Sequence, residues 1–141
     1  MVDLSLLSLE QEYSRPELAR LWGYKDWHAL GRGIITPKDE NKIILFVTHH
    51  KQESLTQYHD ELIDGVLYME GEKGHANDDR LINSMSSGDE VYLFYRERHH
   101  SPFTYYGRIY LMSYEKFSNK PSRFVFNLSL YETLAADHLL V

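Results

Sequence analysis

The sequence predicts an α+β fold, in which a small β-barrel has short helices beside it. The first 33 residues contain two helix-start signals, whereas residues 91–130 contain three runs with apolar side chains at every second position. The 141 residues are 43% hydrophobic and 26% charged, which suffices for one globular core. We therefore expect a single domain, with residues 1–33 as a helical segment packed on a barrel formed by residues 34–141.

Two short helices are predicted in the N-terminal segment. In the letters S-R-P-E, Ser14 is a suitable N-cap, the proline falls in the first turn, and Glu17 holds the capping-box position. This helix should end at Gly23. Asp26 can cap a second helix, Trp27–Leu30.

Several strands are predicted from apolar and alternating runs. The run I-I-L-F-V at residues 43–47 is nearly all apolar and β-branched, which is typical of a strand buried on both faces in the centre of a sheet. The other strands are expected at residues 66–70, 91–96, 103–112 and 124–130. Hairpin-length turns between these strands would close the sheet into a barrel.

A third helix is predicted after a glycine-containing loop. Gly71 and Gly74 allow the backbone to approach a ligand or a neighbouring segment closely. Asn77 or Asp78 can then cap a helix that runs through Met85, with Met85 among its inward-facing residues.

The central segment, residues 57–74, combines aromatic hydroxyls with carboxylates. Tyr58 and Asp60 precede a turn at Asp64-Gly65, and Tyr68 follows in the next strand. Aromatic faces together with an acidic acceptor suit a nucleobase. From the residues alone, an ordinary D-G hairpin with half-buried tyrosines explains the same pattern.

The spacing Y-x-D, D-G and then an aromatic residue resembles the base-binding segment of SET-and-RING-associated (SRA) domains. This resemblance implies that Tyr58 and Tyr68 sandwich a methylated cytosine extruded from DNA. It also implies that Asp60 pairs with the Watson–Crick edge of the base, and that Asp64 and Gly65 form the turn.

A longer stretch, residues 31–128, is similar to a domain found on helicase-like restriction enzymes that cut modified DNA. The blocks that carry this likeness include L-F-Y-R-E at residues 93–97 and P-F-T-Y-Y-G at residues 102–107. The resemblance implies an SRA-like, PUA-related barrel that recognises modified cytosine. Cutting would then belong to a nuclease or helicase partner.

The charge of the chain restricts how it could hold nucleic acid. A net charge of −6 argues against binding through bulk electrostatics, so a local basic face is required. Backbone contacts are expected from Lys73, Arg80, Arg96, Arg98, His99, His100 and Arg108. The alternative is a solvated hairpin tip whose arginines pair with nearby acids.

No motif for catalysis, a metal or a cofactor stands out, so we expect a binding module without catalytic residues. There are no cysteines, which excludes thiolate metal sites. His49 and His50 follow a strand, where adjacent side chains point to opposite faces, so they are not expected to share one metal ion. Two alternatives remain: a metal-dependent nuclease or hydrolase that uses the histidines, and an RNA- or protein-binding PUA-like module.

The expected ligand is double-stranded DNA that contains 5-methyl- or 5-hydroxymethylcytosine, read by base flipping in a restriction or defence setting. The start of the chain does not resemble a signal peptide, and no apolar run approaches 18 residues. We therefore expect a cytoplasmic protein that does not contact a membrane.

Overall fold

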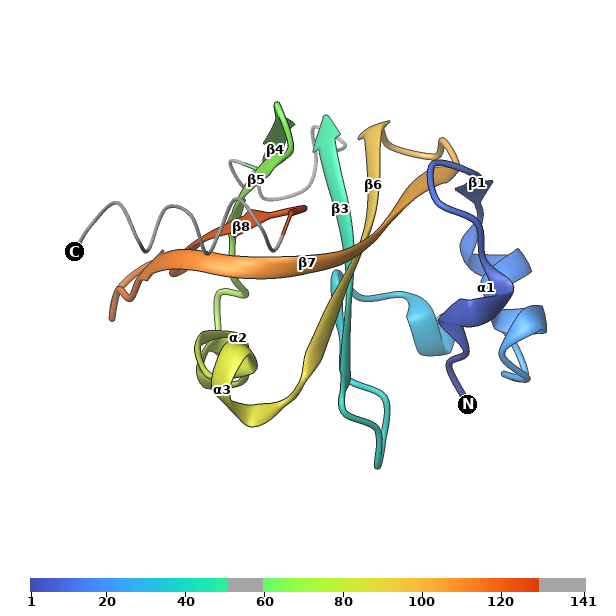
Figure 1. Ribbon diagram of the computed structural model, residues 1–141, viewed down its shortest axis with the longest axis horizontal. Coiled ribbons are helices and arrows are strands. Elements are labelled where there is room, and N and C mark those ends of the chain that lie inside the picture. Colours follow the sequence, from blue (N-terminus) through green and yellow to red (C-terminus); the bar gives the residue numbers. More distant parts are fainter. Residues whose placement is uncertain (51–59, 130–141) are drawn as a thin grey trace.

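The computed structural model describes residues 1–50 and 60–129, which form an α+β fold on one mixed sheet (Figure 1). The strand order is β2-β3-β6-β7-β8-β5-β4, and β1 pairs with β7. The strands are β1 (Glu12–Tyr13), β2 (Ile34–Ile35), β3 (Lys42–His50), β4 (Glu61–Ile63), β5 (Val66–Glu70), β6 (Glu90–Arg98), β7 (Phe103–Glu115) and β8 (Arg123–Asn127). The helices are η1 (Leu4–Leu6), α1 (Arg15–Leu21), η2 (Trp27–Leu30), α2 (Asp78–Ile82) and α3 (Ser84–Ser87).

The central pair of the sheet, β3 and β6, is parallel, and Leu45 lies opposite Leu93. This differs from the predicted series of hairpins, because β4, β5, α2 and α3 all lie between the two strands in the chain. A parallel pair requires such a crossover connection. Among the described residues no pairing joins β4 to β3, so the sheet stays open and the predicted closed barrel is not observed.

Both faces of β3 are buried, as predicted for residues 43–47. Ile43, Leu45 and Val47 contribute to a core shared with β5, β8 and α2. Ile44 and Phe46 contribute to a second core, shared with residues of α1 and η2. The alternation of side chains along one strand therefore divides the apolar interior in two.

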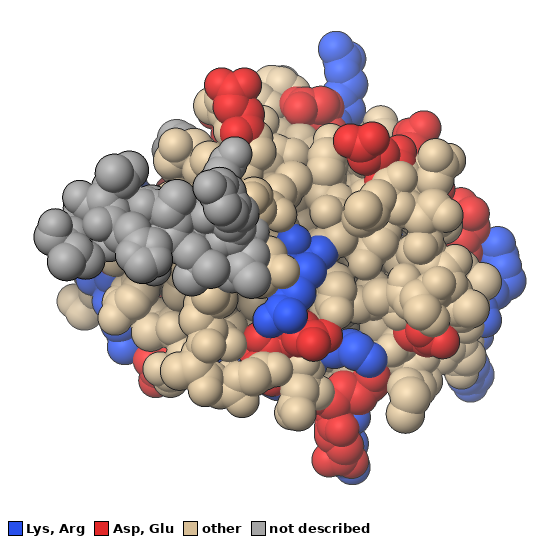
Figure 2. Space-filling model, viewed as in Figure 1, with Lys and Arg blue, Asp and Glu red and all other residues tan. Residues whose placement is uncertain are grey.

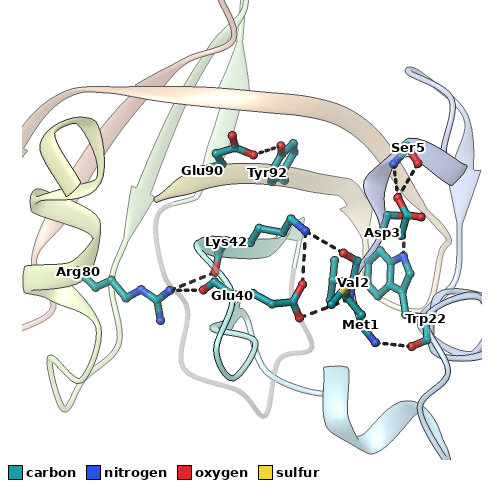
Figure 3. A network of polar contacts seen from close by, with 10 residues as sticks. All are labelled: Met1, Val2, Asp3, Ser5, Trp22, Glu40, Lys42, Arg80, Glu90 and Tyr92. Carbon is teal, nitrogen blue, oxygen red and sulfur yellow. Dashed lines mark hydrogen bonds and ion pairs between the residues drawn. The ribbon is translucent and has the colours of Figure 1, made fainter. Parts of the chain in front are cut away.

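A polar network fastens the N-terminal residues to the start of β3 (Figure 3). The ammonium group of Lys42 donates to the carbonyl of Val2 at 3.0 Å and lies 3.4 Å from the carboxylate of Glu40. Arg80 donates to the carbonyls of Glu40 and Lys42 at 3.1 and 3.4 Å, so α2 is tied to the same point. The network holds elements that lie on opposite sides of the sheet in Figure 1.

The two helices predicted in the N-terminal segment, α1 and η2, begin where capping chemistry predicted. Ser14 and Glu17 form the complete capping box of α1, and Gly23 follows the helix with φ of +76°. Asp26 caps η2 by accepting a hydrogen bond from the amide of His28, although this helix is of the 3₁₀ type. Hydrogen bonds between neighbours in sequence determine these starts.

The third predicted helix is broken into α2 and α3 at Asn83, and its predicted cap is wrong. Asn77 makes no side-chain capping bond, and Asp78 is buried in contacts described below. Met85 is 48% exposed rather than inward-facing. Within residues 1–50 and 60–129, no helix has the length and apolar composition needed to cross a bilayer.

Candidate functional site

A cavity of about 420 Å³ lies between β3 and β5, at the place where the sheet does not close. Its floor includes Phe46 and Val47 of β3 and Met69 of β5. A volume above about 300 Å³ is typical of pockets that hold small organic ligands. The polar side chains around this floor form two groups of opposite charge.

The cationic wall is built around Arg15, the first residue of α1. Its guanidinium donates to the carbonyl of Leu30 at 2.7 Å and lies over the ring of Phe46 at 4.8 Å from the centroid. Burial, together with the nearby charge of Arg96, lowers the pKa of Arg15 to about 10. Arg15 is therefore still cationic at neutral pH, and no carboxylate among the described residues forms an ion pair with it.

Arg96 of β6 completes this wall. It donates to the hydroxyl of Thr48 at 2.8 Å and to the carbonyl of Ser101 at 3.0 Å. Burial lowers the pKa of Arg96. His99 lies beside it, with the two side-chain nitrogens 3.5 Å apart. Partial burial and the nearby His100, Arg96 and Arg15 lower the pKa of His99, which favours the neutral imidazole at pH 7.

The acidic wall consists of Asp60, Glu70 and Glu72. The carboxylate of Asp60 is buried, with 8% of the residue exposed, and accepts a hydrogen bond from the amide of Glu70 at 2.9 Å. This bond fixes Asp60 against the end of β5. A ligand in the cavity would therefore meet both acceptors and cations.

A second cavity of about 250 Å³ adjoins the first, because Arg15 and Arg96 line both. Its other lining residues include Trp27, His100 and Phe103. Trp27 is 43% exposed and its ring stacks on that of His28 at 4.4 Å. The two arginines therefore line both the larger cavity and a smaller one with aromatic residues.

The structure brings together only part of the predicted base-binding set. Asp60 lines the main cavity, but Tyr68 is 47% exposed and lines a different cavity, which it shares with Arg123 and Val125. Asp64 and Gly65 form the predicted turn, with φ of +50° and +77°, and do not line the main cavity. Tyr58 lies outside the described residues.

The predicted backbone-binding set is also divided. Arg96 and His99 line the main cavity, His100 lines the second, and Lys73 and Arg98 are exposed elsewhere. On the face shown in Figure 2, acidic and basic side chains are interspersed, without a broad basic patch on the described residues in view. The cations that line the two cavities are therefore not part of a broad basic surface on this face.

Two predicted backbone contacts lie elsewhere and have partners within the protein. Arg80 makes a bidentate pair with Asp89 at 3.0 and 3.2 Å, in addition to its bonds in Figure 3. Arg108 lies 3.8 Å from the carboxylate of Glu90. Arg108 of β7 is paired with Tyr92 of β6. Tyr92 precedes Arg96 by four residues, so Arg108 lies roughly 13 Å from Arg96 along the strand direction.

Sequence reasoning missed Arg15, which it treated only as part of a helix start. A cation in the first turn opposes the helix dipole, so its presence there was a signal of another role. It also missed the acidic wall residues Glu70 and Glu72. Their approach to Asp60 depends on the β4–β5 hairpin and not on local sequence.

Near Gly71, which also lines the cavity, the buried Asp78 and Ser122 form a cluster with His75, whose side chain is 29% exposed. The same oxygen of Asp78 lies 2.7 Å from His75 Nδ1 and accepts from the Ser122 hydroxyl at 2.7 Å. Ser122 is 0% exposed, so this arrangement does not present a nucleophile to a substrate. It positions the loop after β5, since the amide of Gly71 donates to the carbonyl of Ser122 at 2.8 Å.

The expectation that His49 and His50 point to opposite faces is wrong. Their ring centroids lie 4.2 Å apart, tilted by 31°, so the two side chains come together at the end of β3. Glu97 of β6 lies beside them.

Residues 7–137 match the model of a family described as Domain of unknown function (DUF3427). No curated protein matches the chain.

Proposed function

The chain belongs to the DUF3427 family, and for this member we propose a nucleic-acid-binding module that reads 5-methyl- or 5-hydroxymethylcytosine in double-stranded DNA. The observation that carries the proposal is the cavity between β3 and β5, which is lined by both acidic and cationic residues. Its acidic wall suits the donor edge of a cytosine, and its cationic wall suits a phosphate.

The base would enter the main cavity after extrusion from the duplex. A carboxylate is the usual acceptor for the exocyclic amine of cytosine, and Asp60 is fixed in position by its bond from Glu70. The planar guanidinium groups of Arg15 and Arg96 offer flat surfaces on which a base can stack. Extrusion costs a few kcal/mol, which these contacts and phosphate binding would offset.

The phosphate next to the extruded base would bind at Arg15 and Arg96. Both guanidinium groups are anchored by backbone carbonyls, so little side-chain freedom is lost when an anion binds. Charge-assisted bonds from arginine to phosphate are among the stronger hydrogen bonds in proteins. The adjoining cavity, with Trp27 and His100, would accept the neighbouring nucleotide.

We extend the proposal to an SRA-like, PUA-related fold. It rests on the mixed sheet, in which β4 lies near β3 without pairing with it in the described part of the chain. In this arrangement a gap between strands, rather than a loop on the surface, receives the base. Cutting of the DNA would belong to a nuclease or helicase partner.

The test is binding of the full chain to short labelled duplexes that differ at one position, which carries cytosine, 5-methylcytosine or 5-hydroxymethylcytosine. We expect tighter binding to one modified duplex by roughly tenfold, within the range for one accommodated methyl group. Asp60→Asn should abolish this preference, because it removes the negative charge and replaces one of the two acceptor oxygens with a donor.

Asp64→Asn is the matched control. It makes the same chemical change in the same segment, but in a turn outside the cavity, and asparagine tolerates the left-handed φ of +50° found there. Equal binding of wild-type protein to all three duplexes would overturn the proposal. Preference for RNA of the same sequence would favour an RNA-binding module instead.

A further inference from the structure

We propose that His49, His50 and Glu97 form a binding site for one divalent transition-metal ion, with Zn²⁺ as the expected occupant. Their potential ligand atoms all lie within 4.8 Å of one another. The site is separate from the proposed base cavity, and its function does not depend on that proposal.

The parallel pairing of β3 and β6 brings these residues together. Thr48 lies opposite Arg96 and His50 opposite Arg98, so His49 and Glu97 occupy the intervening positions of adjacent strands. Their side chains meet, with Nδ1 of His49 2.9 Å from a carboxylate oxygen of Glu97. The amide of His99 donates to the carbonyl of His50 at 3.1 Å, which holds the end of β3 against β6.

The distances suit coordination after small side-chain rotations. Two ligand atoms bound at about 2.1 Å to one ion lie roughly 3 to 4 Å apart. His49 and Glu97 are already within this range, and His50 is close to it. The side chains of His49 and Glu97 are 30% and 65% exposed, so an ion can enter from solvent and keep water at its remaining positions.

The donor set selects the class of ion. Two imidazoles and one carboxylate suit Zn²⁺ and its first-row neighbours. Ca²⁺ and Mg²⁺ prefer shells made only of oxygen, so they should bind much more weakly. An ion here would cross-link β3 to β6 at the strand ends, one residue beyond the Thr48–Arg96 contact of the cavity wall.

The experiment is calorimetric titration of the full chain, free of any affinity tag and pretreated with chelator, with Zn²⁺ and in parallel with Mg²⁺. Co²⁺ absorption spectra provide a second readout, since they report on the ligands directly. We expect one equivalent of Zn²⁺ to bind, with no comparable binding of Mg²⁺. His50→Ala and Glu97→Gln should each weaken Zn²⁺ binding at least tenfold and change the Co²⁺ spectrum.

His28→Ala is the matched control. His28 also lies 3.0 Å from a carboxylate, that of Asp26, and is exposed, but no second histidine of the described residues joins it in such a group. This variant should bind Zn²⁺ like the wild type. His50 and Glu97 are exposed, so their variants should fold, which circular dichroism would verify. Failure of the wild type to bind, or binding that is unchanged in His50→Ala and Glu97→Gln, would overturn the proposal.

Discussion

Arg15 and Arg96 lie over the same aromatic ring, that of Phe103, with guanidinium carbons 4.9 and 4.1 Å from its centroid. Two like charges are thus held close together without a carboxylate pair among the described residues. The ring and the backbone acceptors stabilise them in part. An anion that binds both would remove the remaining repulsion.

The closeness of Arg15 and Arg96 predicts how DNA binding should change when one of the two charges is removed. In Arg15→Gln, affinity for DNA should fall by about 1.5–3 kcal/mol, the usual value of a hydrogen bond to a charged group. The slope of log affinity against log salt should become shallower by about one. Fluorescence anisotropy across a salt series measures both quantities.

Arg108→Gln is the comparison for this experiment, because Arg108 pairs with Glu90 away from the cavity. It should leave both affinity and salt slope nearly unchanged. If it matched Arg15→Gln in both respects, binding would depend on total charge rather than on the cavity. Arg15→Lys separates charge from shape, since lysine keeps the charge and loses the planar fork.

His99 predicts a pH dependence of binding. Its pKa is lowered from the ordinary value of 6.5 by partial burial and by His100, Arg96 and Arg15. Bound phosphate should raise this pKa, so protonation and binding are coupled and affinity should rise as the pH falls below 6.5. The folded state binds this proton less tightly than the unfolded state, so His99 opposes stability in the same pH window.

NMR titration of the His99 ring, with and without DNA, measures the shift directly. His99→Gln should flatten the rise in affinity at low pH. An unchanged pH profile in this variant would assign the effect to another group.

Any side chain at Gly71 should disturb the packing at the edge of the cavity. A Cβ atom at Gly71 would lie 2.9 Å from a carboxylate oxygen of Asp78 and 2.9 Å from a ring carbon of Phe124. Gly71→Ala should therefore lower the free energy of unfolding by about 1–3 kcal/mol. Urea denaturation measures this change.

Gly74→Ala is its control, because a Cβ there meets no atom within 4 Å among the described residues. This substitution should change stability little. A loss as large as that of Gly71→Ala would mean that the flexibility of the loop, not the space at Gly71, is what matters.

Removal of the buried Ser122 hydroxyl should cost the fold two hydrogen bonds. Its hydroxyl donates to Asp78 at 2.7 Å and accepts from the amide of Phe117 at 3.3 Å. Ser122→Ala should destabilise the fold by about 1–3 kcal/mol, because it leaves buried groups with fewer partners. Thermal unfolding beside the exposed Ser86→Ala, which should have little effect, tests this.

Local chemistry made several elements predictable from the sequence. Ser14 and Asp26 cap their helices through neighbouring amides, and the Asp64-Gly65 turn needs only its own two residues. The outward position of Tyr68 was also available from the sequence. Leu67 and Met69, on either side of Tyr68, are apolar and should point into the core, so in a strand Tyr68 points the other way. The base-pocket interpretation overlooked this alternation.

The cationic wall of the cavity was not predictable in the same way. Arg15 and Arg96 are far apart in the chain and meet only because α1 packs against the face of the sheet that carries Phe46 and Phe103. No periodic pattern indicates which of the chain's 15 basic residues will converge. Likewise, alternating apolar residues predict that β3 and β6 are strands, but not that they pair in parallel.

The parallel pairing of β3 with β6 also determines the order of events when the chain folds. Leu45 can pair with Leu93 only after the residues between them have been synthesised, and pairing of strands so distant in sequence is slower than pairing of neighbours. During that interval the apolar strand at residues 43–47 has no partner on its β6 side and can pair with other chains. The rate of refolding, and its loss to aggregation at high protein concentration, should therefore depend on how quickly β6 arrives.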